Sequence, residues 1–295
     1  MRTWRPLEKI VERIEAAEQL DDVAETVAGW ARKLIPPGPV EDVLTGVPAG
    51  HPLHPAIVAV PIGAWVSVGL LDALGEDAAA RRLTAFGCVT AVPAAAAGAS
   101  DWVTTSGAER RVGLVHALIN DAALTAYGLS WFARRRGHRA RGIALSALGA
   151  GLISAAGWLG GHLAYGRGVG VDTTAFQQFP QDWTDAGPES DIPAEGGLAQ
   201  MEADGIPLLV TRRADAVIAM ADRCTHRGGP LHEGAISGGC VTCPLHGSEF
   251  SLDDGTVRSG PATRPQPTFE TRIHDGRLEV RRHDVAALRT NPVGR

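Results

Sequence analysis

Residues 224–250 read CTHRGGPLHEGAISGGCVTCPLHGSEF, and this stretch decides how the C-terminal part of the chain folds. Its first half places Cys224 two residues before His226, and its second half places Cys243 three residues before His246. Glycine and proline surround both pairs. Glycine lets a backbone N–H approach an inorganic sulfur closely, and proline stiffens a loop. Two loops that each present one thiol and one imidazole predict a metal centre built from all four side chains.

These two loops resemble the cluster-binding loops of Rieske proteins. The resemblance implies a [2Fe–2S] cluster with Cys224 and Cys243 on one iron and His226 and His246 on the other. Exchanging two thiolates for neutral imidazoles removes negative charge and raises the reduction potential. The alternative is a Cys2His2 zinc site, which uses the same four atoms. The tight Cys-x-His pair and the glycine and proline content of both loops favour the cluster.

The Rieske resemblance extends over an all-β domain, residues 182–284, between a linker at 173–181 and a tail at 285–295. Short apolar runs separated by glycine-containing turns predict its strands, at about 198–201, 207–211, 216–220, 268–273 and 278–281. The resemblance implies that Pro261 belongs to a loop packed over the cluster. It also implies that Ser248 donates a hydrogen bond to a cluster sulfur, whereas Phe250 replaces a tyrosine donor.

Two positions assign the domain to one branch of the family. Gly229 and Leu245 stand where Rieske proteins of quinol-oxidising complexes carry two cysteines joined as a disulfide, so the domain resembles the ferredoxin type found with oxygenases. We expect Arg227, Leu231 and Leu245 to surround the exposed edges of the two histidine rings. They would form the docking patch for the redox proteins that donate and accept electrons.

The middle of the chain, residues 45–172, predicts a four-helix transmembrane bundle. Four apolar stretches, each near the roughly 17–25 residues that span a bilayer, lie at about 55–71, 83–99, 112–132 and 142–165. Residues 1–44 carry apolar residues at helical spacing and predict an amphipathic segment, either solvated or lying on the membrane. The predicted fold class is therefore a four-helix transmembrane bundle followed by an all-β Rieske-type domain.

Two motifs mark the ends of the predicted bundle. AGHPLHP at 49–55 opens it, and WLGGHLAY at 158–165, followed by GVGV at 168–171, closes it. These motifs resemble a poorly characterised family of bacterial four-helix membrane domains, which implies a lipid bilayer as partner and no established activity. The net charge of −5 and the lack of a basic stripe exclude a nucleic-acid partner.

Arginine is concentrated in the loops after the first and third apolar stretches: Arg81, Arg82, Arg134, Arg135, Arg136, Arg139 and Arg141. The positive-inside rule places these loops in the cytoplasm. Both termini, and with them the cluster domain, are then expected on the extracytoplasmic side of the cell membrane.

An even number of crossings brings several histidines to one membrane face. His51 and His54 precede or open the first helix, His116 lies near the start of the third, and His162 lies near the end of the fourth. One interpretation is a site for haem, a metal ion or a quinone. The alternative is that these residues cap helices and bond to one another.

The motifs together predict a membrane-anchored one-electron carrier. No facial triad for mononuclear iron is apparent in the sequence, so an oxygenase is not expected. Two alternatives remain: a quinol- or haem-linked membrane oxidoreductase, and a redox sensor whose cluster state alters a partner.

Overall fold

The computed structural model describes residues 6–283. Residues 1–5 and 284–295, which include the predicted tail 285–295, lie outside the described residues. The chain forms two compact units. A helical unit comprises the chain up to Thr45 and Pro52–Gly170, and a second unit comprises Gly46–His51 and the chain from Val171 onward. The predicted linker 173–181 falls inside this second unit.

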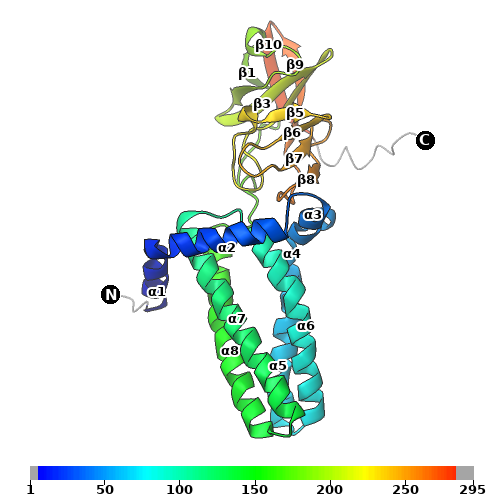
Figure 1. Ribbon diagram of the computed structural model, residues 1–295. Helices are drawn as coiled ribbons and strands as arrows, with labels where there is room; N and C mark the ends of the chain where they lie inside the picture. Colours follow the sequence, from blue (N-terminus) through cyan, green and yellow to red (C-terminus); the bar gives the residue numbers. More distant parts are fainter. Residues whose placement is uncertain (1–5, 284–295) are drawn as a thin grey trace, which may run out of the picture. The chain divides into compact units, whose positions relative to one another are not determined.

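Four long helical segments form a bundle in the helical unit (Figure 1). Within residues 6–283, four helices are long and apolar enough to cross a membrane: α4 with α5 (Leu53–Ile57 and Ala59–Ala73), α6 (Asp77–Trp102), α7 (Gly107–Arg135), and α8 (Arg139–Gly161) with its widened last turn η3 (His162–Gly166). The helices continue past the predicted apolar stretches into polar residues. Gly75 and Gly137, both at φ +80°, follow α5 and α7 closely, in a conformation that suits glycine after a helix end.

The bundle is an internal repeat of two helical hairpins, offset by 62 residues. Trp65 and Tyr127, separated by this offset, stack face to face with ring centroids 4.4 Å apart. Each ring packs on a glycine of the second helix in its own hairpin. A Cβ atom would lie 2.4 Å from Trp65 at Gly87 and 2.6 Å from Tyr127 at Gly149. The same contacts therefore recur in both hairpins.

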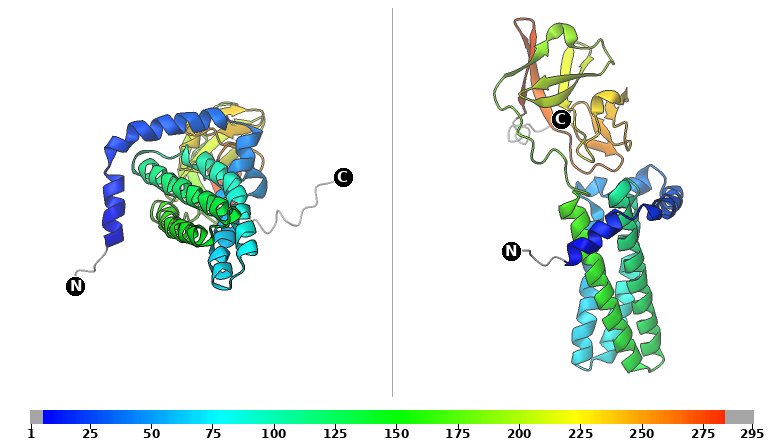
Figure 2. Two further views of the ribbon diagram at one scale, coloured as in Figure 1. Left: turned by 60° about the horizontal axis from the view of Figure 1, so that its bottom comes forward. Right: turned by 90° about the vertical axis from the view of Figure 1, so that its left-hand side faces the viewer.

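Three N-terminal helices belong to the helical unit: α1 (Pro6–Glu15), α2 (Asp21–Leu34) and α3 (Pro39–Thr45). Helix α2 crosses the end of the bundle at which α7 begins, and the views in Figures 1 and 2 both show this crossing. The carboxylate of Asp21 accepts two 2.6 Å hydrogen bonds from Arg111, which lower the pKa of Asp21. These polar contacts and the packing of Val11 on α7 attach the segment to the bundle.

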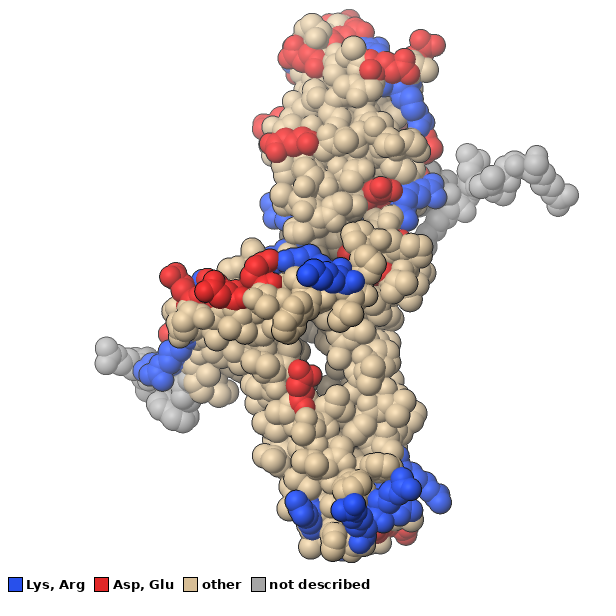
Figure 3. Space-filling view, in the orientation of Figure 1, with Lys and Arg blue, Asp and Glu red and all other residues tan. Residues whose placement is uncertain are grey.

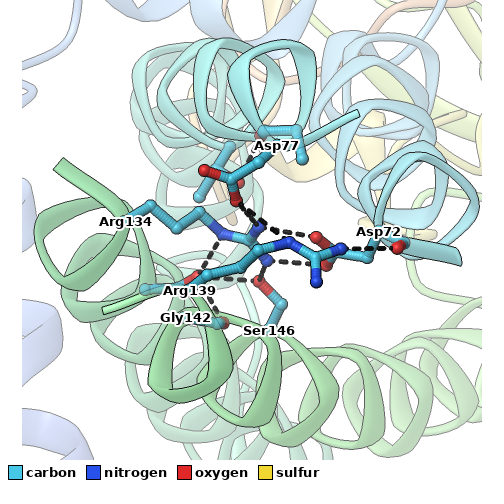
Figure 4. Close-up of polar contacts among 9 residues, drawn as sticks. Asp72, Asp77, Arg134, Arg139, Gly142 and Ser146 are labelled. Carbon is cyan, nitrogen blue, oxygen red and sulfur yellow. Dashed lines mark hydrogen bonds and ion pairs between the residues drawn. The ribbon is translucent and has the colours of Figure 1, made fainter. Parts of the chain in front are cut away.

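The opposite end of the bundle holds a buried ion-pair network. The guanidinium of Arg134 donates two 2.6 Å hydrogen bonds to Asp72 and one of 3.1 Å to Asp77. Figure 4 shows these groups converging from three helices, with Ser146 contributing from α8. Arg134 was expected among the loop charges, but its side chain is fully buried because Asp72 neutralises it. The other arginines at this end form the basic cluster at the bottom of Figure 3, below largely uncharged helix sides.

The second unit is all-β, as predicted. In its described part, one six-stranded antiparallel sheet has the order β1-β10-β9-β4-β3-β2 and a four-stranded sheet has the order β5-β6-β7-β8. The strands of the larger sheet are β1 (Thr184–Pro188), β2 (Ala199–Ala203), β3 (Ile206–Arg213), β4 (Ala216–Ala221), β9 (Thr268–His274) and β10 (Arg277–Arg282). Most of their buried apolar side chains form one core cluster, whereas Leu209 and Met220 belong to a second.

The smaller sheet is built from four three-residue strands: β5 (Ala235–Ser237), β6 (Cys240–Thr242), β7 (Glu249–Ser251) and β8 (Val257–Ser259). Val241 and Phe250 are fully buried in a second core cluster that also includes Leu231 from the short helix η5 (Leu231–Glu233). Because this cluster contains Cys224 and Cys243, it fixes where the two motif loops begin.

Candidate metal centre

The first motif loop, Cys224–Pro230, leaves the end of β4 and leads to η5. The N–H of Cys224 donates to the carbonyl of Gly229 over 2.9 Å, and the N–H of Gly228 donates back to the carbonyl of Cys224 over 2.8 Å. These two bonds close a tight turn, at φ +73° for Gly228. The turn holds His226 beside Cys224.

The second motif loop, Cys243–Ser248, connects β6 to β7 and has the same construction. The N–H of Cys243 donates to Ser248 O over 2.8 Å, and the N–H of Gly247 donates to Cys243 O over 3.1 Å. Gly247 also adopts φ +73°. Both loops therefore need a residue that tolerates a left-handed backbone four positions after the cysteine, and both have glycine there.

The two loops bring the thiols of Cys224 and Cys243 within hydrogen-bonding distance of each other. Their mutual hydrogen bond lowers the pKa of Cys243 to about 6 and raises the pKa of Cys224, so the pair shares one proton. Backbone N–H groups donate to both sulfur atoms, those of His226 and Arg227 to the first and those of Leu245 and His246 to the second. Such donors stabilise a thiolate, which is the form that binds metal.

The two imidazoles form the other half of the site. The rings of His226 and His246 lie edge to face, with centroids 5.2 Å apart. Burial, and next the charge of His246, lower the pKa of His226 to about 3. His226 is therefore neutral at physiological pH, as a metal ligand must be.

The four side chains thus fall into a thiol pair and an imidazole pair. Between residues 6 and 283, no three His, Cys, Asp or Glu side chains converge in the manner of a single-ion site. A structural zinc ion takes four ligands around one point, whereas a Rieske cluster takes two ligands on each of two irons. The pairwise arrangement fits the two-iron cluster.

Glycine makes room at the centre of the site. A Cβ atom on Gly229 would lie 2.8 Å from Cys243 Sγ and 2.9 Å from Leu245 Cγ. Since real side chains do not approach this closely, a larger residue at 229 would push the two loops apart. Positions 229 and 245 are therefore in contact, and they are the two positions at which the quinol-oxidising branch of the resembling family carries its disulfide cysteines.

A third loop, Gly260-Pro261-Ala262, packs against the second motif loop. The N–H of Ala262 donates to Ser248 Oγ over 3.0 Å, and Ser248 and Pro261 are buried. Because Ser248 Oγ accepts this bond, its own hydrogen remains available as a donor. A Cβ atom on Gly260 would lie 2.7 Å from Ser248 Cα, so this contact also requires glycine.

Two residues that the sequence motifs did not single out fix the first loop. Gln266, 2 % exposed, accepts from the N–H of Thr225 over 3.1 Å and donates to Ala221 O over 2.6 Å. The hydroxyl of Thr173 donates to Cys224 O over 2.7 Å. Gln266 lies between two prolines, which marks it in the sequence as a position with a constrained backbone. No sequence feature near Thr173 indicates its role.

The predicted docking patch needs one correction. Leu231 is fully buried in the core beneath the loops, because η5 turns its side chain inward, so it contributes no surface. Leu245 is 55 % exposed at the tip of the second loop, and Arg227 is half-buried.

The four histidines predicted to gather at one membrane face lie in different surroundings. His54 and His116 lie in the bundle, where each Nδ1 is 2.8 Å from a backbone carbonyl oxygen. His162 Nε2 lies 3.0 Å from the Glu15 carboxylate. His51 is exposed and belongs to the Gly46–His51 segment of the second unit.

Family models match both parts of the chain. Residues 182–270 match the Rieske [2Fe-2S] domain, and residues 50–173 match the predicted membrane protein family DUF2231. A solved complex of reduced oxygenase and oxidised ferredoxin in carbazole 1,9a-dioxygenase is similar, with 33 % identity and a TM-score of 0.31 over 34 % of this chain and 94 % of that one.

Several curated relatives of the chain are ferredoxins. The anthranilate 1,2-dioxygenase ferredoxin subunit of Burkholderia cepacia is 39 % identical over 25 % of this chain and 68 % of its own length. Ferredoxin CarAc of Metapseudomonas resinovorans is 38 % identical over 25 % of this chain and 69 % of its own length. The chain therefore belongs to the Rieske [2Fe–2S] family, through a domain that follows one of the DUF2231 type.

Proposed function

We propose that this chain is a membrane-anchored one-electron carrier whose cluster is held by Cys224, Cys243, His226 and His246. The observation that carries the proposal is the pairing of thiol with thiol and imidazole with imidazole on two loops of equal construction. When bound, such a cluster takes up and releases one electron. The residues around it supply N–H donors, exclude water from the sulfur side and leave the imidazole side accessible.

Access to the imidazole side defines where an electron partner docks. Leu245 and Pro244 are exposed at the loop tip, and both ligand histidines are partly exposed. A small apolar surface with Arg227 at its edge suits a transient redox partner, since such encounters bury little area. The dioxygenase ferredoxins among the relatives support an oxygenase or a reductase as the partner class.

Anchoring rests on the four apolar helices and on the match to a predicted membrane protein family. The basic loops at one end of the bundle favour the cytoplasm for that end. On this basis the cluster unit faces the extracytoplasmic side.

Electron paramagnetic resonance of dithionite-reduced membranes, together with an assay of labile sulfide, tests the ligand set. We expect Cys243→Ser and His246→Gln to lose the Rieske signal. The matched controls Cys240→Ser and His274→Gln lie in strands β6 and β9, outside the two loops, and should retain it. Bound zinc without labile sulfide, or an unchanged signal in the ligand variants, would refute the proposal.

A further inference from the structure

Two histidines of the helical unit offer imidazole lone pairs that the carrier function does not use. His54 Nδ1 lies 2.8 Å from the carbonyl oxygen of Ala94, and His116 Nδ1 lies 2.8 Å from that of Ala156. A carbonyl oxygen only accepts hydrogen bonds, so each Nδ1 carries the ring proton. Each Nε2 is then left as an acceptor, and an imidazole held in this way is oriented as a metal ligand usually is.

Asn120 supports this tautomer for His116. Its amide nitrogen lies 2.9 Å from the backbone oxygen of His116 and 3.1 Å from His116 Nε2. Because the backbone oxygen must accept, the amide group presents N–H to both atoms. His116 Nε2 therefore accepts.

The two imidazoles are equivalent positions of the internal repeat. Each ring rests on a glycine: a Cβ atom would lie 2.9 Å from His54 at Gly98 and 3.1 Å from His116 at Gly160. The histidine, the residue whose carbonyl oxygen accepts from it and the supporting glycine all recur with the 62-residue offset. The first hairpin has Val58 at the position equivalent to Asn120. The features that recur in both hairpins are therefore the ones that orient the two imidazole rings.

The surroundings favour a bound group in which the metal ion already has most of its coordinating atoms. His54 lies at the start of the first span and His116 in the first half of α7, so both lie toward the end of the bundle that α2 crosses. Figure 3 shows a narrow opening between the two sides of the bundle below α2, toward this end. Over residues 6–283 no third metal-binding side chain joins the pair, so a bare ion would have two protein ligands.

We propose that His54 and His116 are the axial ligands of a haem bound between the two hairpins. The porphyrin supplies four nitrogens, and two neutral imidazoles complete a six-coordinate iron. When haem binds, the Asn120 side chain would give up its hydrogen bond to His116 Nε2 and keep its hydrogen bond to the backbone oxygen of His116. The proposal rests on the helical unit alone and is independent of the iron–sulfur cluster.

The test is purification of the full chain in detergent from cells supplied with haem precursor, followed by a pyridine haemochrome assay and optical spectra. We expect about one haem per chain with a six-coordinate, low-spin spectrum. His54→Gln and His116→Gln should each lower haem content at least about tenfold or convert the spectrum to high spin. Titration of folded apoprotein with haemin, with folding checked by size exclusion, separates lost ligation from lost folding.

Matched variants sharpen the test. His162→Gln, at a histidine held by Glu15, should retain the haem, and so should Asn120→Val, which installs the residue of the first hairpin. Gly98→Ala and Gly160→Ala should disturb the spectrum by displacing the rings. Apoprotein that binds no haemin, haem content unchanged in the double histidine variant, or binding of copper or quinone in place of haem would overturn the proposal. The cluster signal should persist in all these variants.

Discussion

At the scale of residues, the motif loops hold their ligands with backbone groups more than with side chains. Four N–H groups point at the two sulfur atoms, and a glycine with positive φ closes each loop. Side chains then adjust the environment: Ser248 is buried at the end of the second loop, and Gln266 is hydrogen-bonded to the first. The identity of the ligands follows from the motif, but their pairing follows from how two loops meet.

Replacing Ser248 with alanine should lower the reduction potential. Its hydroxyl accepts from Ala262 and so keeps its own hydrogen for a cluster sulfur. Losing a donor destabilises the more negative reduced state. A difference of about 1.4 kcal/mol corresponds to about 60 mV for one electron, and we expect a shift of that order in a redox titration. Ser237→Ala, on an exposed strand of the same sheet, is the control, and an unchanged potential in Ser248→Ala would exclude the donor role.

At the scale of elements, each hairpin of the bundle packs a ring onto a glycine of its second helix. Tyr127 is fully buried against Gly149, and Trp65 is stacked on it from the other hairpin. Close contact between helices through glycine is typical of membrane bundles, where packing rather than water drives association.

Gly149→Ala should destabilise the bundle, and Gly151→Ala on the same helix should not. The new Cβ at 149 would lie 2.6 Å from the Tyr127 ring, and nothing lies within 4 Å at 151. Overpacking costs about 1–3 kcal/mol, whereas alanine in place of an unencumbered helical glycine gains about 0.5–1 kcal/mol. Thermal unfolding in detergent, followed by size exclusion, measures the difference; equal effects would contradict this packing.

Arg134 and Asp72 should contribute less to stability as a pair than the loss of either partner alone suggests. Arg134→Leu leaves a buried carboxylate and should cost about 3–5 kcal/mol, whereas the double variant Arg134→Leu with Asp72→Leu should regain most of the stability. Arg136→Leu, at an exposed arginine, is the control. Folded yield and thermal unfolding report the effect, and a double variant as unstable as the single would show that the charges themselves are required.

At the scale of the whole molecule, one chain joins an apolar helical unit to a cluster-binding β unit. The boundary is not a single cut, since Gly46–His51 clusters with the second unit although it lies between two helices of the first. Four crossings, an even number, would put the N-terminal helices and the cluster unit on the same membrane face.

Labelling of single cysteines tests the proposed orientation. In a Cys88→Ser, Cys240→Ser background, Ser237→Cys reports the β unit and His138→Cys reports the loop between α7 and α8; both positions are exposed. An impermeant maleimide applied to intact spheroplasts should label the first and not the second. The reverse pattern would place the cluster unit in the cytoplasm.

Features that depend on local spacing can be predicted from the sequence. The proposed ligand set comes from two short motifs, and the four apolar helices come from apolar runs of sufficient length, because both signals lie within one segment. The five strands expected in the β unit appear within a few residues of their predicted ends. The offset of 62 residues was also present in the sequence and would have emerged from comparing the chain with itself.

Features that depend on contacts between residues far apart in the sequence become visible only in the folded protein. The small sheet was not predicted because three-residue strands show too little alternation and are held by neighbours. Leu231 looked like surface until η5 turned it into the core, and Arg134 looked like a loop charge until Asp72 met it from the other hairpin. The pairing of the thiols and the carbonyl contacts of His54 and His116 are of the same kind. Each is set by packing between segments, which no local pattern encodes.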